Sequence, residues 1–237
     1  MHRLWLAMAA CLGVAASAPA MAADPARPGR LVVAELFTSE GCSSCPPADA
    51  LLSELARTRP DVLPLAFHIT YWDRLGWPDP FAFAGATDRQ RQYASVLGLD
   101  TIYTPQLVVD GTRDVVGSDR GAVLQALRGA AAQAASPVSL TLSRAAGGIA
   151  ASVGAGSAGQ RATLLLAGYD TAHRTAVAHG ENAGRTLSES NIVRGLVRAG
   201  DWRGTAMTLQ APAPAGEHVA AILQAADGQI LAAAAID

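Results

Sequence analysis

The first half of the chain alternates between apolar runs and segments in which apolar residues recur every three or four positions. Short apolar runs predict buried strands, and the wider spacing predicts helices. Residues 31–37 (LVVAELF) are expected to form a strand. Residues 46–58 (PPADALLSELART) are expected to form a helix, because their apolar residues recur at helical spacing and prolines are tolerated in a first turn. Residues 61–70 are expected to form a second strand, in which Pro64 predicts a strand start or a bulge.

The next stretch with helical character covers residues 80–98. An Asp-Pro dipeptide provides a helix-start signal, and Thr87 with Gln90 three residues later resembles a capping box. Gly98 is suited to the end of this helix, because glycine readily adopts the left-handed conformation found there.

Residues 105–117 (PQLVVDGTRDVVG) hold two short runs around an Asp-Gly pair, which is typical of a β-hairpin. A further helical pattern follows, and Ser118 is expected to cap it. The predicted order is therefore strand, helix, strand, helix, strand, strand, helix.

The pattern changes after Pro137. Residues 138–237 hold short alternating segments such as VSLTLS, ATLLLAGY and HVAAILQA, separated by turn residues at roughly regular spacing. This favours an antiparallel β-sandwich-like domain. We expect an α/β protein with one domain over residues 31–136 and a smaller β-rich domain over residues 138–237.

The N-terminus has the pattern of a secretory signal peptide over residues 1–22. A positive residue precedes an apolar run over about residues 4–18, and the AMA tripeptide that ends at Ala22 fits a cleavage site. The run is shorter than the roughly 20 residues of a membrane helix, so no stable membrane span is expected after cleavage. A lipoprotein signal with Cys11 as the lipidated residue is the alternative. Both imply export, and we expect a bacterial periplasmic location.

Composition argues against nucleic acid as a partner, and the cysteine count bears on disulfide formation. Half of the 237 residues are hydrophobic and the formal net charge is −2. Because no basic patch stands out, nucleic acid is not an expected partner. Cleavage near Ala22 would leave only Cys42 and Cys45, which an oxidising compartment can join as a disulfide.

The spacing of the two cysteines favours chemistry over stabilisation. Closing a ring of about four residues stabilises a fold by only about 2 kcal/mol, against about 4.7 kcal/mol for a 100-residue loop. The pair also lies between a predicted strand and a predicted helix, a position typical of redox CxxC motifs.

Thiolates are the attacking species in disulfide exchange, and free N–H groups at a helix start favour an anion. Cys42, nearer that end, is therefore expected to be the exposed nucleophile. Cys45 is expected to attack the mixed disulfide and release the product.

These elements together resemble the thioredoxin fold. The stretches ELFTSEGCSSCPPAD, FHITYWDRLGWPDPF, RQRQYA and YTPQLVVDG are similar to a secreted bacterial thioredoxin-like family of uncharacterised function. The resemblance covers residues 31 to about 135, and HGENAGRTLSESNIVRGL extends it more weakly. It implies a thioredoxin-like fold for the first domain.

The resemblance also implies roles for single residues. Cys42 and Cys45 match the redox positions, and Thr104–Pro105 matches a cis-proline that lies beside the disulfide and leaves the Thr104 backbone open to an extended substrate. Glu35 lies close to where thioredoxins place a buried acid, which would take the proton from Cys45.

Two departures from the thioredoxin pattern matter. The spacer is Ser43-Ser44, so the redox direction is not inherited from thioredoxins. Pro46-Pro47 follows directly, which would start the regular helix near Pro46 and weaken the effect of the helix N-terminus on Cys42.

Aromatic residues crowd positions 67–83. Core packing is the simpler interpretation. The functional alternative is an aromatic rim, with Trp72 and Trp77 beside the disulfide, that binds unfolded substrate.

Other polar residues have a structural and a functional interpretation. His68, at a strand end, is either a packed residue or a redox or metal ligand, and Glu40 is expected to be exposed. Glu181, Asn182 and Arg185 lie in a polar loop, which is either a structural turn or a surface that meets the redox face.

Three functions remain open. The first is a periplasmic thiol–disulfide oxidoreductase that needs no cofactor and acts on protein thiols or disulfides, with an unknown redox partner. The second is a copper-binding or delivery protein, since two thiolates suit Cu(I). The third is a non-catalytic interaction protein with a permanent disulfide. Beyond the two cysteines no metal ligand set is expected.

Overall fold

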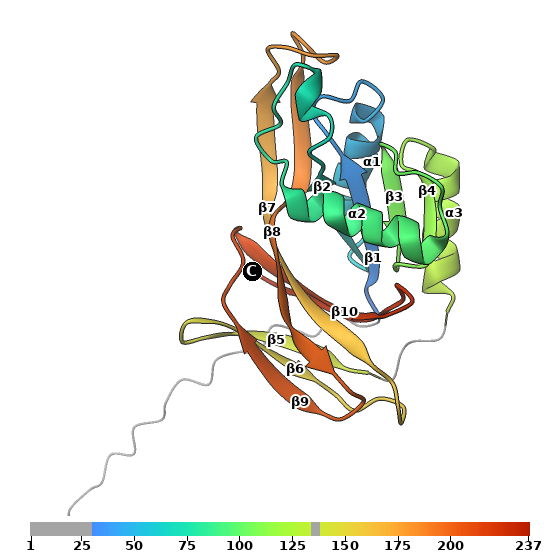
Figure 1. Ribbon diagram of the computed structural model, residues 1–237, viewed down its shortest axis with the longest axis vertical. Helices are drawn as coiled ribbons and strands as arrows, with labels where there is room; N and C mark the ends of the chain where they lie inside the picture. The colour runs from blue at the N-terminus through green and yellow to red at the C-terminus, as the bar shows by residue number, and fades with distance from the viewer. Residues whose placement is uncertain (1–29, 134–137) are drawn as a thin grey trace, which may run out of the picture.

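The computed structural model describes residues 30–133 and 138–237 (Figure 1). The expected signal peptide, Cys11 and Pro137 lie outside the described residues, so these expectations stay predictions. None of the helices in the described part of the chain is long and apolar enough to span a membrane.

The first half has the predicted order of elements. They are β1 (Val32–Thr38), α1 (Pro46–Thr58), β2 (Val62–His68), the 3₁₀-helix η1 (Asp73–Leu75), α2 (Ala84–Leu97), β3 (Gln106–Val109), β4 (Arg113–Val116) and α3 (Arg120–Ala131). The apolar spacing predicts the bounds of α1 to the residue.

The second half consists of strands. They are β5 (Leu140–Ala145), β6 (Gly148–Val153), β7 (Ala162–Ala176), β8 (Thr186–Trp202), β9 (Met207–Ala211), β10 (His218–Ala225) and β11 (Ile230–Ile236). β7 and β8 span 15 and 17 residues and form one long hairpin, whereas the sequence pattern predicts short strands only.

Eight strands form one mixed sheet in the order β11-β10-β7-β8-β2-β1-β3-β4. The sheet runs through both halves of the chain, because β8 joins β2 in parallel at the Ala66–Ile192 pair. β1 and β2 are also parallel, and the other neighbours are antiparallel. The expected α/β class is confirmed.

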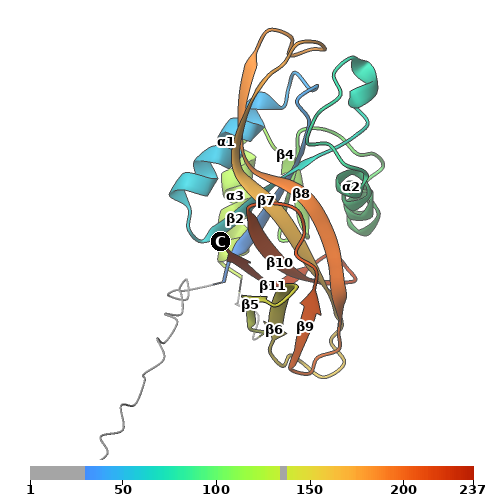
Figure 2. The same ribbon diagram turned by 90° about the vertical axis from the view of Figure 1, so that its left-hand side faces the viewer.

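Helices cover both faces of the sheet around β1 (Figure 2). Successive side chains of a strand point to opposite faces. Ala34 and Leu36 accordingly pack with the apolar faces of α1 and α3, whereas Val33 and Phe37 pack with α2. Both faces of the central strands are therefore buried.

A three-stranded antiparallel sheet, β5-β6-β9, packs on the far part of the large sheet. Ile149 and Val153 of β6 share an apolar cluster with Leu164 and Leu223 of the large sheet and with the fully buried Trp202. The two sheets thus face each other over a common core, as a sandwich does.

Two helix starts differ from the sequence prediction. α2 begins at Ala84 and not at residue 80, because Asp79 instead forms a turn in which its carboxylate accepts from the Phe81 N–H. Thr87 does not cap α2; its hydroxyl accepts a hydrogen bond from the backbone N–H of Thr70. Asp119, and not Ser118, caps α3 by accepting from the Ala122 N–H.

Pro64 lies inside β2 and not at its start. Its carbonyl accepts from the side-chain amide of Asn191 on β8. The N–H and C=O of a strand residue point to the same side, so the N–H that proline lacks would also face β8. The ladder between β2 and β8 has only one pair, and the proline therefore interrupts little.

Candidate functional site

The two cysteines lie in a loop of residues 39–45, which we call the disulfide loop, between the end of β1 and the start of α1. They form a disulfide with a Cα–Cα distance of 5.4 Å. Cys45 is the N-cap residue of α1, so the bond lies where the sheet connects to the helix.

Hydroxyl groups surround the sulfur of Cys42. The Thr104 hydroxyl donates to Cys42 Sγ at 3.3 Å, and Ser44 Oγ lies at 3.3 Å from the same atom. Trp72 Nε1 donates to Thr104 Oγ1 at 2.8 Å. The Thr104–Pro105 peptide is cis, as the thioredoxin resemblance implies. The structure thus brings Thr104 and Trp72 to the disulfide.

Both cysteines are fully buried, with 0% of either residue exposed. The expectation of an exposed Cys42 is therefore wrong for this conformation. A segment from the second half of the chain contributes to this burial. Residues 177–185, which we call the hairpin tip, join β7 to β8 and lie at the same end of the molecule as the disulfide loop (Figures 1 and 2).

The hairpin tip contacts the disulfide loop directly. The side-chain amide of Asn182 donates to the carbonyl oxygens of Glu40 and Cys42, each at 2.9 Å. Glu181 Oε2 accepts from the Ser43 N–H at 3.0 Å, and Arg185 Nη1 donates to Asn182 Oδ1 at 2.8 Å. Of the two interpretations of this loop, a surface that meets the cysteine pair agrees with its contacts to the disulfide loop.

The start of α1 offers few free N–H groups to a thiolate. Pro46 and Pro47 have no N–H, and the N–H groups of Ala48 and Asp49 both bond to the carbonyl of Cys45. We expected free N–H groups at the helix start to stabilise a Cys42 thiolate. The paired prolines remove these N–H groups, so the helix start does not stabilise the thiolate in this way.

Trp77 and Glu40 form a second contact of the disulfide loop. Trp77 Nε1 donates to Glu40 Oε2 at 2.7 Å. Glu40 is fully buried, not exposed as expected, and burial raises the pKa of its carboxyl group. Trp77 also touches Gly180 of the hairpin tip, where an added Cβ would lie 3.1 Å from Trp77 Cβ.

A buried group of titratable side chains lies next to the site. His68 Nδ1 bonds to Asp79 Oδ2 at 2.8 Å, and its Nε2 lies 3.9 Å from Glu189 of β8. Asp49 follows Cys45 by one helical turn and accepts a hydrogen bond from Thr38 at 2.7 Å. All are at most 5% exposed. We call Glu40, Asp49, His68, Asp79 and Glu189 the acid cluster.

Protons are held tightly in the acid cluster. Burial raises the pKa of Asp49 to about 7 and that of Glu189 to about 8. Burial lowers the pKa of His68, but the charges of Asp79 and Glu189 outweigh it and raise the value to about 9. The pKa of Asp79 is lowered, because the nearby His68 outweighs the effect of burial.

The sequence reasoning named His68 but missed Asp49 and Glu189. Asp49 had a local signal, because residues four apart on a helix lie on one face and Asp49 follows Cys45 at that spacing. Glu189 had none, since its approach depends on the fold of the β7–β8 hairpin.

Glu35 lies away from the start of α1. It is fully buried and pairs with Arg89 of α2, with Arg89 Nε at 2.5 Å from Oε1, and Tyr93 also donates to it. Its strand neighbours Val33 and Phe37 pack on the α2 face, opposite to the face that α1 covers. The structure does not bring Glu35 together with the cysteines.

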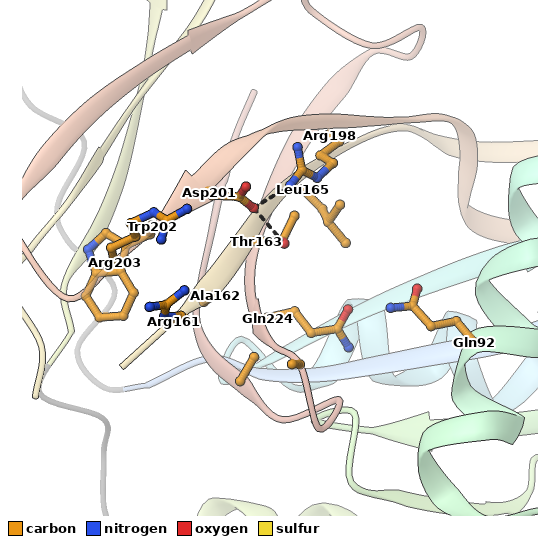
Figure 3. Close-up of a pocket in the computed structure, with 12 residues that line it drawn as sticks. Gln92, Arg161, Ala162, Thr163, Leu165, Arg198, Asp201, Trp202, Arg203 and Gln224 are labelled. Carbon is orange, nitrogen blue, oxygen red and sulfur yellow. Dashed lines mark hydrogen bonds and ion pairs between the residues drawn. The ribbon is translucent and has the colours of Figure 1, made fainter. Parts of the chain in front are cut away.

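Other features of the described residues lie apart from the disulfide. No group of three or more His, Cys, Asp or Glu residues among them is placed to hold a metal ion. A cavity of about 390 Å³ lies between α2, β7, β8 and β10, lined by Arg161, Arg203 and the Arg198–Asp201 ion pair among others (Figure 3). None of its lining residues belongs to the disulfide loop.

Comparisons with known proteins identify a family and two similar structures, none of them with a stated activity. Residues 33–225 match the family DUF1223, described as "Protein of unknown function". The crystal structure of protein AGR_C_4864 from Agrobacterium tumefaciens is similar, with a TM-score of 0.72 and 30% identity, over 89% of this chain and 96% of that chain. HBP35 of Porphyromonas gingivalis is similar in fold alone, with a TM-score of 0.58 and 12% identity, over 88% of this chain and 75% of that chain. None of the curated proteins compared with the chain matches it.

Proposed function

This chain belongs to the DUF1223 family, and we propose that it is a periplasmic thiol–disulfide oxidoreductase with a thioredoxin-like core. One observation carries the proposal: a four-residue disulfide ring between a strand end and a helix start, with the Thr104 and Ser44 hydroxyls on the Cys42 sulfur. Such a ring stabilises the fold by only about 2 kcal/mol, so breaking the disulfide costs the fold little.

The exchange reaction uses both sulfurs. A thiolate of the substrate attacks Cys42 Sγ, the Cys42–Cys45 bond breaks, and Cys45 leaves with the electron pair. A second substrate thiolate then attacks the substrate sulfur of the mixed disulfide and releases Cys42. The substrate loses two electrons and gains a disulfide, while the protein becomes a dithiol. The same steps run in reverse with a disulfide substrate.

The surroundings of the two sulfurs suit different roles. The hydroxyls of Thr104 and Ser44 stabilise negative charge on Cys42 when it is reduced, because hydrogen bonds to the charged form favour it. Asp49 is suited to exchange a proton with Cys45, since the Cβ atoms of residues four apart on a helix lie only about 5–6 Å from each other. Glu35 is less suited, because its carboxylate is already paired with Arg89.

The complete burial of the disulfide favours a second candidate, an interaction protein with a permanent disulfide. The two candidates differ in the reduction potential of the pair. A structural disulfide has a potential below about −300 mV, whereas catalytic pairs lie above that value.

The reduction potential therefore tests the proposal. The mature protein is equilibrated in dithiol buffers of known potential, and its free thiols are alkylated and counted. We expect a value between about −270 and −120 mV, the range of known exchange proteins. Insulin reduction and oxidative refolding follow, with Cys42→Ser as the inactive control. A potential below about −300 mV together with no turnover in either direction would contradict the proposal.

A further inference from the structure

The hairpin tip is a preformed unit. Within it the Val177 N–H donates to the Arg185 carbonyl at 2.9 Å, and the Gly184 N–H donates to the Val177 carbonyl at 2.8 Å. Arg185 also fixes the amide of Asn182 by holding its Oδ1 atom. The Asn182 N–H donors are therefore aimed at the disulfide loop by the tip itself.

Three hydrogen bonds join the tip to the disulfide loop, and each of them uses a backbone group of that loop. Asn182 occupies two carbonyl oxygens, those of Glu40 and Cys42, and Glu181 occupies one N–H, that of Ser43. Asn182 is fully buried in this contact, whereas Glu181 is exposed. The bond from Ser43 also holds the pKa of Glu181 below its usual value, so this carboxyl group is charged.

The contact is incompatible with exchange as it stands. A substrate sulfur must approach Cys42 along the axis of the disulfide bond, and a residue with no exposed surface admits no such approach. The disulfide loop continues directly into β1 and α1, which belong to the buried core. The tip is held by fewer backbone links, because no strand pairing in the described sheet joins residues 177–185 to the disulfide loop and β8 pairs with β2 at a single position.

We propose that the hairpin tip is a movable cover that positions the disulfide loop and is displaced by an extended, cysteine-containing polypeptide segment. The inference rests on the proposed function and adds the substrate class to it. Displacement frees two acceptors and one donor of the Glu40–Ser43 backbone. An extended peptide presents donors and acceptors of the same kind along its own backbone, so it can replace the tip.

The flanking side chains fit the same occupant. Trp72 and Trp77 are half-buried and both lie near Gly41, whose added Cβ would lie 3.5 Å from Trp72 Cβ and 3.8 Å from the Trp77 carbonyl. Their rings offer apolar contact to the side chains of a bound peptide, which a small thiol cannot use.

Access to the disulfide can be measured without any protein substrate. The oxidised mature protein is mixed with TCEP, and free thiols are trapped and counted over time. The reducing agent reaches only the open form, so the rate follows the open population when opening is fast. Asn182→Ala removes the two hydrogen bonds that hold the tip on the Glu40 and Cys42 carbonyls and should speed reduction about tenfold or more. Glu181→Gln removes only a charge at an exposed position and should speed it about threefold.

The control is His179→Ala, at an exposed position of the same tip that makes no hydrogen bond to the disulfide loop among the described residues. Its rate should equal that of the wild type. The wild-type rate should also level off at high TCEP concentration, where opening becomes limiting. The cover is overturned if wild type, Asn182→Ala and Glu181→Gln are reduced equally fast with no plateau. Glu181→Gln keeps this test decisive should Asn182→Ala fold poorly.

Insulin turnover separates this inference from the proposed function. Rates with TCEP that rank as expected, without insulin turnover by any variant, would support the cover and contradict the oxidoreductase. Insulin turnover with identical TCEP rates in all variants would support the oxidoreductase and overturn the cover.

Discussion

Glu35 and Arg89 form an ion pair in which both residues are buried, each at most 3% exposed. Tyr93 donates to the same carboxylate, and Gln224 accepts from Arg89. A buried charge without its partner is far more costly than a buried pair, because neither water nor protein then solvates it. The pair therefore acts as a structural unit that joins β1, α2 and β10.

Replacing Glu35 tests this interpretation. Glu35→Gln leaves the Arg89 guanidinium buried without a counter-charge, so we expect the free energy of unfolding to fall by about 3–5 kcal/mol in urea titrations. The reduction potential of the disulfide should change little. Glu54→Gln is the matched control, because Glu54 pairs with Arg120 at the surface, where solvent screens the pair and we expect little loss of stability. A loss as small as that of the control would contradict the structural role.

Residues near the disulfide could be predicted where the signal was local or came from the resemblance. The CxxC spacing identified Cys42 and Cys45, and the resemblance identified Thr104. The sequence placed Asn182 only in a loop with two open interpretations and assigned nothing to Glu189, because each approaches the site only through the long β7–β8 hairpin, some 140 residues away in the chain. For the same reason the burial of Cys42 could not be predicted from the residues around it.

At the scale of elements, helical spacing predicted α1 fully, because Ala48 and its three leucines all face one core. β8 was not recognised, since its segment is rich in polar residues and its burial alternates irregularly. Its strand conformation depends on pairing with β7 along almost its whole length. Tertiary pairing, and not local propensity, forms this strand.

Two hairpins from the two halves of the chain meet at glycines. Gly111, between β3 and β4, has φ +70° and lies against Gly228, between β10 and β11. A Cβ on Gly111 would lie 1.8 Å from the Gly228 carbonyl oxygen, so no side chain fits there. The Ile230 N–H also donates to the Asp110 carbonyl at 3.0 Å, which closes this contact.

Gly111→Ala should therefore separate the two hairpins. Backbone strain at positive φ costs about 1–2 kcal/mol and the clash adds to it, so we expect a loss of at least about 2 kcal/mol in thermal or urea unfolding. Gly129→Ala is the control. It lies within α3 with no atom within 4 Å of an added Cβ, and alanine should stabilise that helix by up to about 1 kcal/mol. Equal effects at the two glycines would show that the contact is loose.

For the molecule as a whole, the continuous sheet places titratable groups from both halves in one buried cluster. Asp49 comes from α1, His68 from β2 and Glu189 from β8, while Glu40 and Asp79 come from the adjoining loops. The carboxyl groups outnumber the imidazole. Since burial disfavours charge, the folded protein holds protons there that the unfolded chain releases.

This excess of bound protons fixes how stability depends on pH. The pKa values of Asp49, Glu189 and His68 rise to about 7, 8 and 9 on folding, from 3.8, 4.5 and 6.5. A raised value stabilises the fold below the unfolded pKa, and this stabilisation is lost as the pH rises to the folded one. The lowered pKa of Asp79 acts only below about pH 4. The free energy of unfolding should therefore fall from about pH 5 to pH 9, by at most about 1.4 kcal/mol per pH unit for each extra proton.

Urea unfolding at a series of pH values measures this slope. Glu189→Gln removes one of the groups that take up a proton, and its neutral amide occupies nearly the same volume, so its slope should be shallower than that of the wild type between pH 5 and 8. Asp88→Asn, at an exposed residue of α2, should leave the slope unchanged. A wild-type stability that rises over this range would mean that the folded protein binds fewer protons than the unfolded chain, and that water or a counter-charge keeps Asp49 and Glu189 ionised.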